Sequence, residues 1–312
     1  MNSIASTLVY GFPDAGKTSY IRDCIQNGFF HRRGTTLILC FEQGEEQYDE
    51  AALAEKRASV AYYSGGDIRA FCEKSIEVFR PDRIYAEMNN GISDLKEQFP
   101  ECMKQSFAIT LIDWDTFQVY YATNIQGMSR MVSGSDQVTF RGCPSGRMLE
   151  PYSQSFRIMN PKAVYLRQDP MGYHEKAFEI FVPFSLDKDE IEVGEKDYLP
   201  FWLDAFDHPE HYGGKVLRFT VPLEIRKDDS GRPWSCGRVV MTCCMADLQF
   251  MSLELDASGV EGGPVLKEGW CLLDAKAELS SDCYGRKKVR LMPEKKHPVK
   301  APQELIMDSR RR

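Results

Sequence analysis

The chain has 312 residues, of which 43% are hydrophobic and 27% charged, and its formal net charge is −7. This composition is typical of a globular protein with sizeable cores, and the length suggests two domains. The acidic balance argues against nucleic acid as the partner, and no run of about 18 apolar residues predicts a membrane-spanning helix.

The first residues lack the basic segment followed by an apolar segment that is typical of a secretory signal peptide, so we expect a cytoplasmic protein. Thiols stay reduced in that compartment. The ten cysteines are therefore expected to be free thiols, some buried and some serving as metal ligands, rather than a disulfide framework.

A glycine-rich motif lies between the first predicted strand, residues 4–10, and the first predicted helix, residues 18–26. It matches G-x-x-x-x-G-K-[ST] at every fixed position, and the flanking elements disfavour a chance match in a turn. Backbone N–H groups of such a loop and of the helix N-terminus bind phosphates. Lys17 is expected to reach the β- and γ-phosphates, and the Thr18 hydroxyl to bind Mg²⁺. The residues predicted to hold the nucleotide are Gly11, Asp14, Ala15, Gly16, Lys17, Thr18 and Ser19.

Strand-like and helix-like segments alternate up to about residue 168. The further strands are expected over residues 35–41, 59–63, 83–86, 107–112, 137–140 and 163–166. The helices are expected over residues 45–57, 67–79 and 115–131, with Asp67 as an N-cap. This alternation predicts an α/β domain over residues 1–168, a P-loop NTPase with a mostly parallel, doubly wound sheet.

The pattern changes after this domain. Residues 169–212 are irregular, and we expect a partly packed linker with one strand over 178–183. Short strands separated by turns follow, over residues 215–221, 238–243, 249–255, 270–279 and 287–292. They predict a small β-barrel over residues 213–308, of the OB-like type.

Acidic side chains and one cysteine stand where predicted parallel strands end. Cys40 and Glu42 follow the second strand, and Glu87 and Asp113 end two later ones. Ligands of open parallel sheets bind beyond the carboxyl ends of the strands, so these side chains should meet there. Glu87 is the preferred candidate to bind Mg²⁺ or orient water, and with Lys17 and Asp113 it forms the predicted catalytic set. A carboxylate that only stabilises a helix N-terminus is the alternative for Glu87.

The loop, Glu87 with a nearby glycine, and Asp113 resemble the CobW/HypB/UreG class of GTPases, which comprises metallochaperones and metal-cofactor maturation factors. The segments from Cys40 to Glu46 and around Asp113 resemble, more narrowly, a CobW-like branch from Firmicutes. The resemblance covers about residues 4–168. It implies binding of GTP, with ATP as the alternative, and of Mg²⁺, with slow hydrolysis coupled to delivery of a metal such as Zn²⁺. It also makes Cys40 and Glu42 candidate metal ligands.

Three marks of that class differ in this sequence. The C-x-C-C motif is reduced to Cys40 followed by Glu42, and E-x-x-G is one residue longer, from Glu87 to Gly91. Arg141 and the residues after it stand where the asparagine of a guanine-reading N-K-x-D would be expected. The choice of base and the retention of turnover therefore stay open.

The segment from Arg238 to Asp247 resembles the C-terminal domain of predicted permease subunits of the YcgQ type, over about residues 197–308. Cys243, Cys244 and Asp247 are candidates for part of a Zn²⁺ site. Vicinal cysteines on a strand point to opposite faces, so a bulge or turn would be needed for both to bind one ion. The alternative is that one of them packs in the core.

His208 and His211 are three residues apart, but Pro209 favours a loop over a helix that presents both as ligands. The first hypothesis for the whole chain is a GTPase that passes a metal to a client protein. The second is a nucleotide-binding scaffold without useful turnover that docks to a membrane permease partner. A small-molecule kinase is a third hypothesis, which would need an arginine-rich lid.

Overall fold

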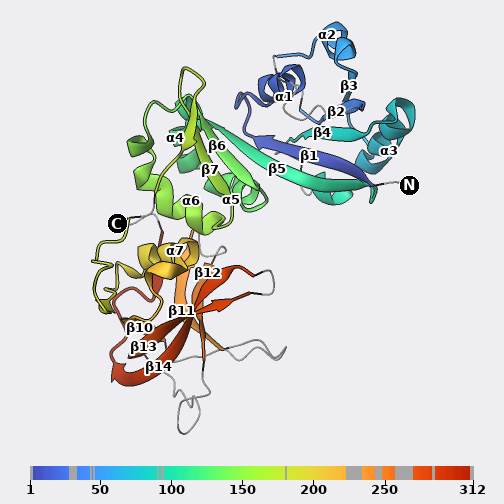
Figure 1. Ribbon diagram of the computed structural model, residues 1–312. Coiled ribbons are helices and arrows are strands. Elements are labelled where there is room, and N and C mark those ends of the chain that lie inside the picture. Colours follow the sequence, from blue (N-terminus) through green and yellow to red (C-terminus); the bar gives the residue numbers. More distant parts are fainter. Residues whose placement is uncertain are drawn as a thin grey trace. The chain divides into compact units, whose positions relative to one another are not determined.

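The computed structural model describes residues 3–27, 34–42, 44, 46–89, 91–92, 95–179, 181–222, 234–242, 248–256, 270–282 and 285–309. The chain forms two compact units (Figure 1). Unit 1 comprises Met1–Leu149 and Lys162–Phe178, and unit 2 comprises Glu150–Pro161 and Glu179–Arg312. Of the segment expected to link two domains, residues 169–178 thus fall in unit 1 and residues 179–212 in unit 2.

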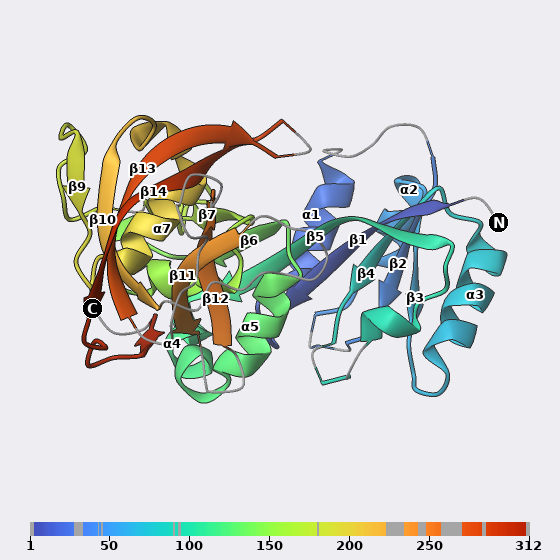
Figure 2. The ribbon, with the colours of Figure 1, turned by 90° about the horizontal axis from the view of Figure 1, so that it is seen from below.

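Unit 1 is built on an eight-stranded sheet of order β3-β2-β4-β1-β5-β6-β7-β8. Its strands are β1 (Ile4–Gly11), β2 (Thr36–Cys40), β3 (Ala58–Tyr62), β4 (Arg83–Glu87), β5 (Met103–Asp113), β6 (Gln137–Arg141), β7 (Val164–Gln168) and β8 (His174–Lys176). Neighbouring strands are parallel except for the antiparallel pair β7–β8. The predicted α/β fold with a mostly parallel sheet is confirmed, and Figure 2 shows β1 to β5 side by side.

Successive strand residues pack on opposite faces of this sheet. Leu8 belongs to a core cluster with Ile68 of helix α3 (Ile68–Phe79). Its neighbour Val9 belongs to another cluster with Ile21 of α1 (Lys17–Gln26) and Leu53 of α2 (Glu50–Glu55). Helices therefore cover both faces, which explains why the strands read as continuous apolar runs.

Local caps set the ends of the helices. Asp67 accepts a hydrogen bond from the Ala70 N–H at 2.9 Å, which confirms the predicted N-cap of α3. The single helix expected over residues 115–131 is instead two, α4 (Trp114–Thr123) and α5 (Ile125–Ser133). Asn124 separates them, because its side-chain oxygen accepts from the Gly127 N–H at 3.1 Å and starts a new helix.

Unit 2 is built on a seven-stranded sheet of order β15-β11-β12-β14-β13-β10-β9. Its strands are β9 (Glu190–Glu192), β10 (Val216–Pro222), β11 (Trp234–Met241), β12 (Leu248–Leu255), β13 (Trp270–Ser281), β14 (Lys287–Val299) and β15 (Ile306–Asp308). The long pairs β10–β13, β11–β12 and β13–β14 are antiparallel. The sheet curls into a half-barrel, in agreement with the barrel-like domain predicted for this part of the chain (Figure 1).

A helix lies where the sequence predicted irregular structure. The helix α7 (Tyr198–Asp207) is almost wholly buried in the core of unit 2, and Tyr198 and Trp202 donate hydrogen bonds to the backbone carbonyls of Met251 and Ser252, both at 2.9 Å. Its first eight residues are all buried, so its sequence lacks the separate apolar and polar faces that predict a surface helix. The strand expected over residues 178–183 is not present in the part of that range that the structure describes.

The remaining elements are short. They are the helix α6 (Ser153–Met159) and the 3-10 helices η1 (Leu95–Gln98), η2 (Gly146–Met148), η3 (Glu150–Tyr152) and η4 (Pro209–His211). Among the described residues, none of the helices is both long enough and apolar enough to span a bilayer.

Candidate functional site

The predicted phosphate loop joins the end of β1 to the start of α1. Gly16 takes a left-handed conformation (φ 75°) immediately before the helix, as does Asp14 (φ 63°) within the loop. A Cβ atom on Gly11 would lie 2.9 Å from both Ala15 Cβ and the Leu111 carbonyl oxygen, so glycine is needed for this close approach. The loop thus enters α1 with the free N–H groups of a helix N-terminus at its end, as a phosphate site requires.

Lys17 is buried although it is charged, with 4% of its surface exposed. Its Nζ atom donates to the carbonyl oxygens of Gly11 at 3.0 Å and Phe12 at 2.9 Å, and forms an ion pair with Glu42 at 3.1 Å. The ammonium group is therefore held at the loop by its own backbone and by one carboxylate. A phosphate that binds Lys17 competes with Glu42 for this charge.

Thr18 and Glu87 come together where α1 begins and β4 ends. Thr18 Oγ1 donates to Glu87 Oε1 at 2.7 Å, and Tyr48 OH donates to the other oxygen, Oε2, at 2.5 Å. Parallel pairing explains this position, since Glu87 is in register with Val9 of β1 and Cys40 of β2. Glu87 is buried, so each hydrogen bond offsets part of the cost of removing the carboxylate from water.

Cys40 lies against the same carboxylate, at the end of β2. Its Sγ is 2.8 Å from the Glu42 carbonyl oxygen and 3.7 Å from Glu87 Oε2. Burial first, and then the negative charge of Glu87, raise the pKa of the Cys40 thiol to about 12. The same two causes raise the pKa of Tyr48 well above its ordinary value. Both groups are therefore protonated at neutral pH and can donate to Glu87.

Asp113 ends β5 and caps the next helix. Its Oδ2 accepts from the N–H of Thr116 at 3.0 Å and from its hydroxyl at 3.1 Å. Among the described residues, no hydrogen bond or ion pair joins it to the other two predicted catalytic residues, Lys17 and Glu87. The sheet register instead places Asp113 beside Arg141 of β6.

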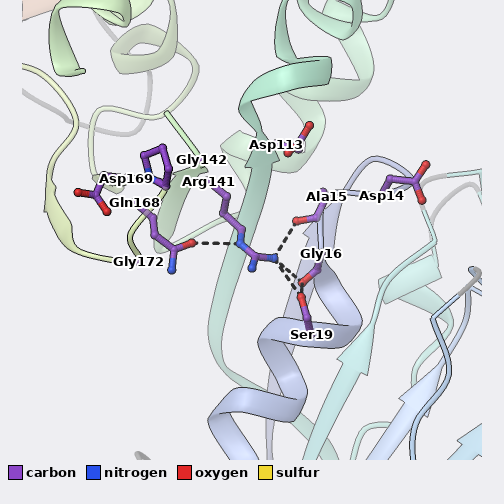
Figure 3. A pocket seen from close by; sticks show the side chains of 11 residues that line it. Asp14, Ala15, Gly16, Ser19, Asp113, Arg141, Gly142, Gln168, Asp169 and Gly172 are labelled. Atoms are coloured by element: carbon purple, nitrogen blue, oxygen red, sulfur yellow. Dashed lines mark hydrogen bonds between the residues drawn. The ribbon is translucent and has the colours of Figure 1, made fainter. Parts of the chain in front are cut away.

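A cavity of about 420 Å³ opens beside the phosphate loop, between the ends of β5, β6 and β7. Arg141 crosses it (Figure 3): its Nη1 donates to the carbonyl oxygens of Ala15 at 3.2 Å and Gly16 at 2.7 Å, and its Nε donates to Gln168 Oε1 at 3.2 Å. A Cβ on Gly16 would lie 1.8 Å from that Nη1, a second reason for glycine there. The cavity lining is Asp14, Ala15, Gly16, Ser19, Asp113, Arg141, Gly142, Gln168, Asp169, Pro170 and Gly172.

Two residues of the predicted nucleotide-binding set, Ser19 and Asp14, differ in their surroundings. Ser19 Oγ donates to the Gly16 carbonyl oxygen at 3.0 Å and lies 3.3 Å from the Nη1 of Arg141. The Asp14 carboxylate is exposed and points away from Arg141 in Figure 3.

One residue of the loop contacts a helix outside the site. The ring of Phe12 lies flat on that of Tyr120 of α4, with centroids 4.1 Å apart and planes inclined by 7°. Offset or flat contacts between aromatic rings stabilise by about 1 kcal/mol beyond area burial. The loop is therefore packed against α4 as well as hydrogen-bonded by Arg141.

Two residues of this site were not predicted from the sequence. Tyr48 lies between β2 and α2, where no periodicity indicates which side chain turns inward. Arg141 occupies the position at which a base-reading motif was expected, and its strand-end location was the available signal. The other predicted metal ligands, Cys243, Cys244 and Asp247, lie outside the described residues.

The residues at this edge fit two kinds of metal ion. The oxygens of Thr18 and Glu87, 2.7 Å apart, are the hard donors that Mg²⁺ prefers. The Cys40 thiol lies 3.7 Å from the Glu87 carboxylate, and this sulfur and oxygen pair suits Zn²⁺ once the thiol loses its proton. The Glu42 carboxylate is paired with Lys17, and only the backbone carbonyl oxygen of Glu42 contacts Cys40. Glu87 is common to both sets.

Similar proteins are found among solved structures. A scan of protein-family models and a search of curated proteins give no match. Among solved structures, the hydrogenase maturation factor HypB from Archaeoglobus fulgidus is 11% identical, with a TM-score of 0.37, over 54% of this chain and 81% of that one. A Zn(II)-bound triple mutant of the YjiA GTPase is 15% identical, with a TM-score of 0.38, over 76% of this chain and 86% of that one.

Proposed function

We propose that this protein binds and slowly hydrolyses a nucleoside triphosphate, GTP in preference to ATP, and couples this to the handling of a metal ion such as Zn²⁺. One observation carries the nucleotide part of the proposal. Lys17 and Thr18 begin α1 directly after the left-handed Gly16, and Thr18 Oγ1 donates to the strand-end carboxylate of Glu87 at 2.7 Å. A strand, a tight loop, a lysine and a hydroxyl in this arrangement form the part of an NTPase that holds phosphates.

The chain's own residues take separate roles in this reaction. Backbone N–H groups of the loop and of the start of α1 bind the phosphate oxygens, and Lys17 leaves Glu42 to neutralise the β- and γ-phosphates. Glu87, held by Tyr48, stays fixed as the phosphate group reacts and orients the attacking water. Positioning and charge neutralisation supply most of the catalysis in such enzymes.

Mg²⁺ would be held by the Thr18 hydroxyl and by Glu87, and when bound it neutralises charge that develops on the phosphates. Asp113 has a supporting role in this proposal, because it caps α4 and lines the cavity beside the loop.

The metal that the protein handles would bind beside Cys40 and Glu87, and Glu42 would join them when its carboxylate leaves Lys17. Two of these residues also belong to the nucleotide site, since Glu42 pairs with Lys17 and Glu87 with Thr18. A phosphate that displaces Glu42 from Lys17 frees a carboxylate for the metal, so occupancy of one site alters the ligands of the other. A protein that receives the metal is the partner this mechanism implies; docking to a permease subunit belongs to the alternative in which nucleotide binds without turnover.

The experiment is a titration of the purified protein with fluorescent GTP and ATP analogues, with and without Mg²⁺, followed by phosphate release. We expect GTP to bind and Mg²⁺ to strengthen this binding. Thr18→Ala should remove only the effect of Mg²⁺ and leave the binding of GTP without Mg²⁺ unchanged. Thr123→Ala, an exposed threonine on α4, is the matched control. Binding of neither nucleotide would disprove the proposal, and binding without any phosphate release would favour the scaffold.

A further inference from the structure

A second group of metal-binding side chains lies in unit 2, around the 3-10 helix η4. His208, Glu210 and His211 each offer one ligand atom, and these atoms all lie within 4.8 Å of one another. Glu210 and His208 are exposed and His211 is half-buried. The group is thus open to solvent, and it shares no residue with the phosphate loop or with the candidate ligands Cys40, Glu42 and Glu87.

The geometry of η4 brings the two histidines together. Pro209 is its first residue, where the fixed φ of proline suits a helix and its missing N–H costs nothing. The His211 N–H donates to the His208 carbonyl oxygen at 3.0 Å, which closes one 3-10 turn. Side chains three residues apart eclipse in such a turn. Accordingly, the two rings stack with centroids 5.0 Å apart. Pro209, which was expected to favour a loop over a helix, is the first residue of this 3-10 turn.

One of the histidines is oriented from behind by a buried carboxylate. His211 Nδ1 lies 2.9 Å from Asp204 Oδ2, and Tyr212 OH donates to the same oxygen at 2.8 Å. Because Nδ1 of His211 faces this carboxyl group, Nε2 is the ring nitrogen left for a metal. Histidine ligands of metals are commonly oriented in this way by a carboxylate.

The third ligand carries the negative charge that a divalent ion requires. Glu210 Oε1 lies 3.4 Å from His208 Nδ1. The group therefore offers two imidazole rings and one carboxyl group as ligands.

We propose that His208, Glu210 and His211 bind one divalent transition-metal ion, with Zn²⁺ as the preferred ion, and that Asp204 is a positioning residue for His211. Two histidines and one carboxylate are an established ligand set for zinc. Three protein ligands leave a fourth position to water, so the bound ion can exchange with a ligand from solution. This site is independent of the nucleotide reaction proposed for unit 1, and it binds metal whether or not nucleotide is present.

The test is a Zn²⁺ titration of the full, reduced chain against a fluorescent chelator, without nucleotide, in a background that carries Cys40→Ser, Cys243→Ser and Cys244→Ser. That background leaves the proposed ligands intact and removes the cysteines of the other candidate sites. We expect one Zn²⁺ per chain, and at least a tenfold loss of affinity in both His208→Ala and His211→Ala. The matched controls are His174→Ala and His297→Ala, which replace exposed histidines on strands β8 and β14. Both should bind Zn²⁺ with the affinity of the background protein.

A second measurement keeps the proposal testable if a variant folds poorly. Visible absorption of bound Co²⁺ distinguishes imidazole and oxygen ligands from thiolates, and circular dichroism reports the fold. Asp204→Asn should weaken binding about 10- to 100-fold while it leaves one Co²⁺ per chain at saturation. Equal affinities in His208→Ala, His211→Ala and the two controls would overturn the proposal, as would a Co²⁺ spectrum that neither histidine variant changes.

Discussion

Unit 1 and unit 2 both bury charged side chains, but the hydrogen-bond and ion-pair partners of these side chains differ between the two units. In unit 1, Lys17 and Glu87 lie at the carboxyl edge of a parallel sheet, and each is held by a group that another ligand could replace. In unit 2, Asp274 of β13 receives two hydrogen bonds from Arg218 of β10, at 2.7 and 2.9 Å, within the sheet itself. We propose that phosphate and metal ligands exchange at the first arrangement and that the second stabilises the fold.

This difference follows from the topology of the two sheets. Parallel strands bring their carboxyl ends to one edge, so polar residues that end separate strands meet there with side chains free to rearrange. Antiparallel strands alternate in direction, so their carboxyl ends do not gather at one edge. A polar pair such as Arg218 and Asp274 instead lies on directly opposite positions of two neighbouring strands. Substitutions at the edge of unit 1 should therefore alter binding and catalysis, and those within the sheet of unit 2 should alter stability.

The largest effect is expected from Lys17→Met. It removes the charge that phosphates would bind, at a cost of about 3 kcal/mol in binding free energy for a charged hydrogen-bond donor. GTP affinity should fall by about 100-fold in calorimetric titration. Lys74→Met, on the exposed side of α3, is the control and should bind as the parent does. An unchanged affinity in Lys17→Met would show that the loop does not hold the triphosphate.

Glu87→Gln should separate binding from turnover. The amide keeps the size of the carboxylate and still accepts one hydrogen bond, but it loses the charge that would hold Mg²⁺ and orient water. We expect phosphate release to fall about 100-fold, the range for removal of one preorganised polar group, while GTP affinity without Mg²⁺ stays the same. Glu77→Gln on α3 is the matched control, and single-turnover phosphate release is the measurement.

Arg218→Met tests the structural side of the comparison. It leaves the buried Asp274 carboxylate without the two hydrogen bonds that the exposed Arg218 side chain donates, which should lower the free energy of unfolding of unit 2 in urea titration. Arg286→Met removes an exposed pair with Asp282 and should cost about 0.5 kcal/mol or less. A similar loss in both variants would contradict the structural role of the pair of Arg218 and Asp274.

The Arg218→Met effect should also depend on pH. Hydrogen bonds from Arg218 lower the pKa of Asp274 from its ordinary value of 3.8. A carboxyl with a lowered pKa in the folded state contributes stability above its unfolded pKa, and this contribution disappears as the pH falls through the lowered value. The difference between the parent and Arg218→Met should accordingly be complete above about pH 5 and shrink below about pH 4.

The smallest effect is expected from Glu42→Gln. Loss of the partly exposed ion pair removes a competitor of the phosphates for Lys17, worth about 1 kcal/mol. GTP should bind about fivefold more tightly, mainly through faster association in stopped-flow mixing. Glu46→Gln, which breaks an exposed pair with Arg22, should leave the affinity unchanged. Weaker binding in Glu42→Gln would mean that Glu42 supports the nucleotide rather than competes with it.

The sequence predicts unit 1 well because its signals are local and its topology is regular. The glycine motif specifies the loop, and a carboxylate that ends a buried strand, such as Glu87, must lie at the shared edge of the sheet. Tyr48 was not predicted, because its hydrogen bond to Glu87 depends on how an irregular segment folds towards that residue. The break at Asn124 was missed because a side-chain cap within a helical pattern gives no change in hydrophobic period.

Unit 2 is less predictable for physical reasons. Its short strands are indicated by alternation and turns, but the first eight residues of helix α7 are all buried, so the sequence shows no separate apolar and polar faces. The stacking of His208 on His211 depends on a single 3-10 turn, a structure too short to leave a periodic signal. Residues that act together here come from turns and helix ends rather than from the ends of parallel strands.

The flat contact between Phe12 and Tyr120 gives the chain an internal optical reporter. Phe12 belongs to the phosphate loop, and Tyr120 lies on α4, whose first residue is Trp114. A shift of the loop on phosphate binding would move one ring relative to the other and change the surroundings of Tyr120. Intrinsic fluorescence excited at tyrosine and tryptophan can therefore follow occupancy of the loop in the unlabelled protein, without a modified nucleotide.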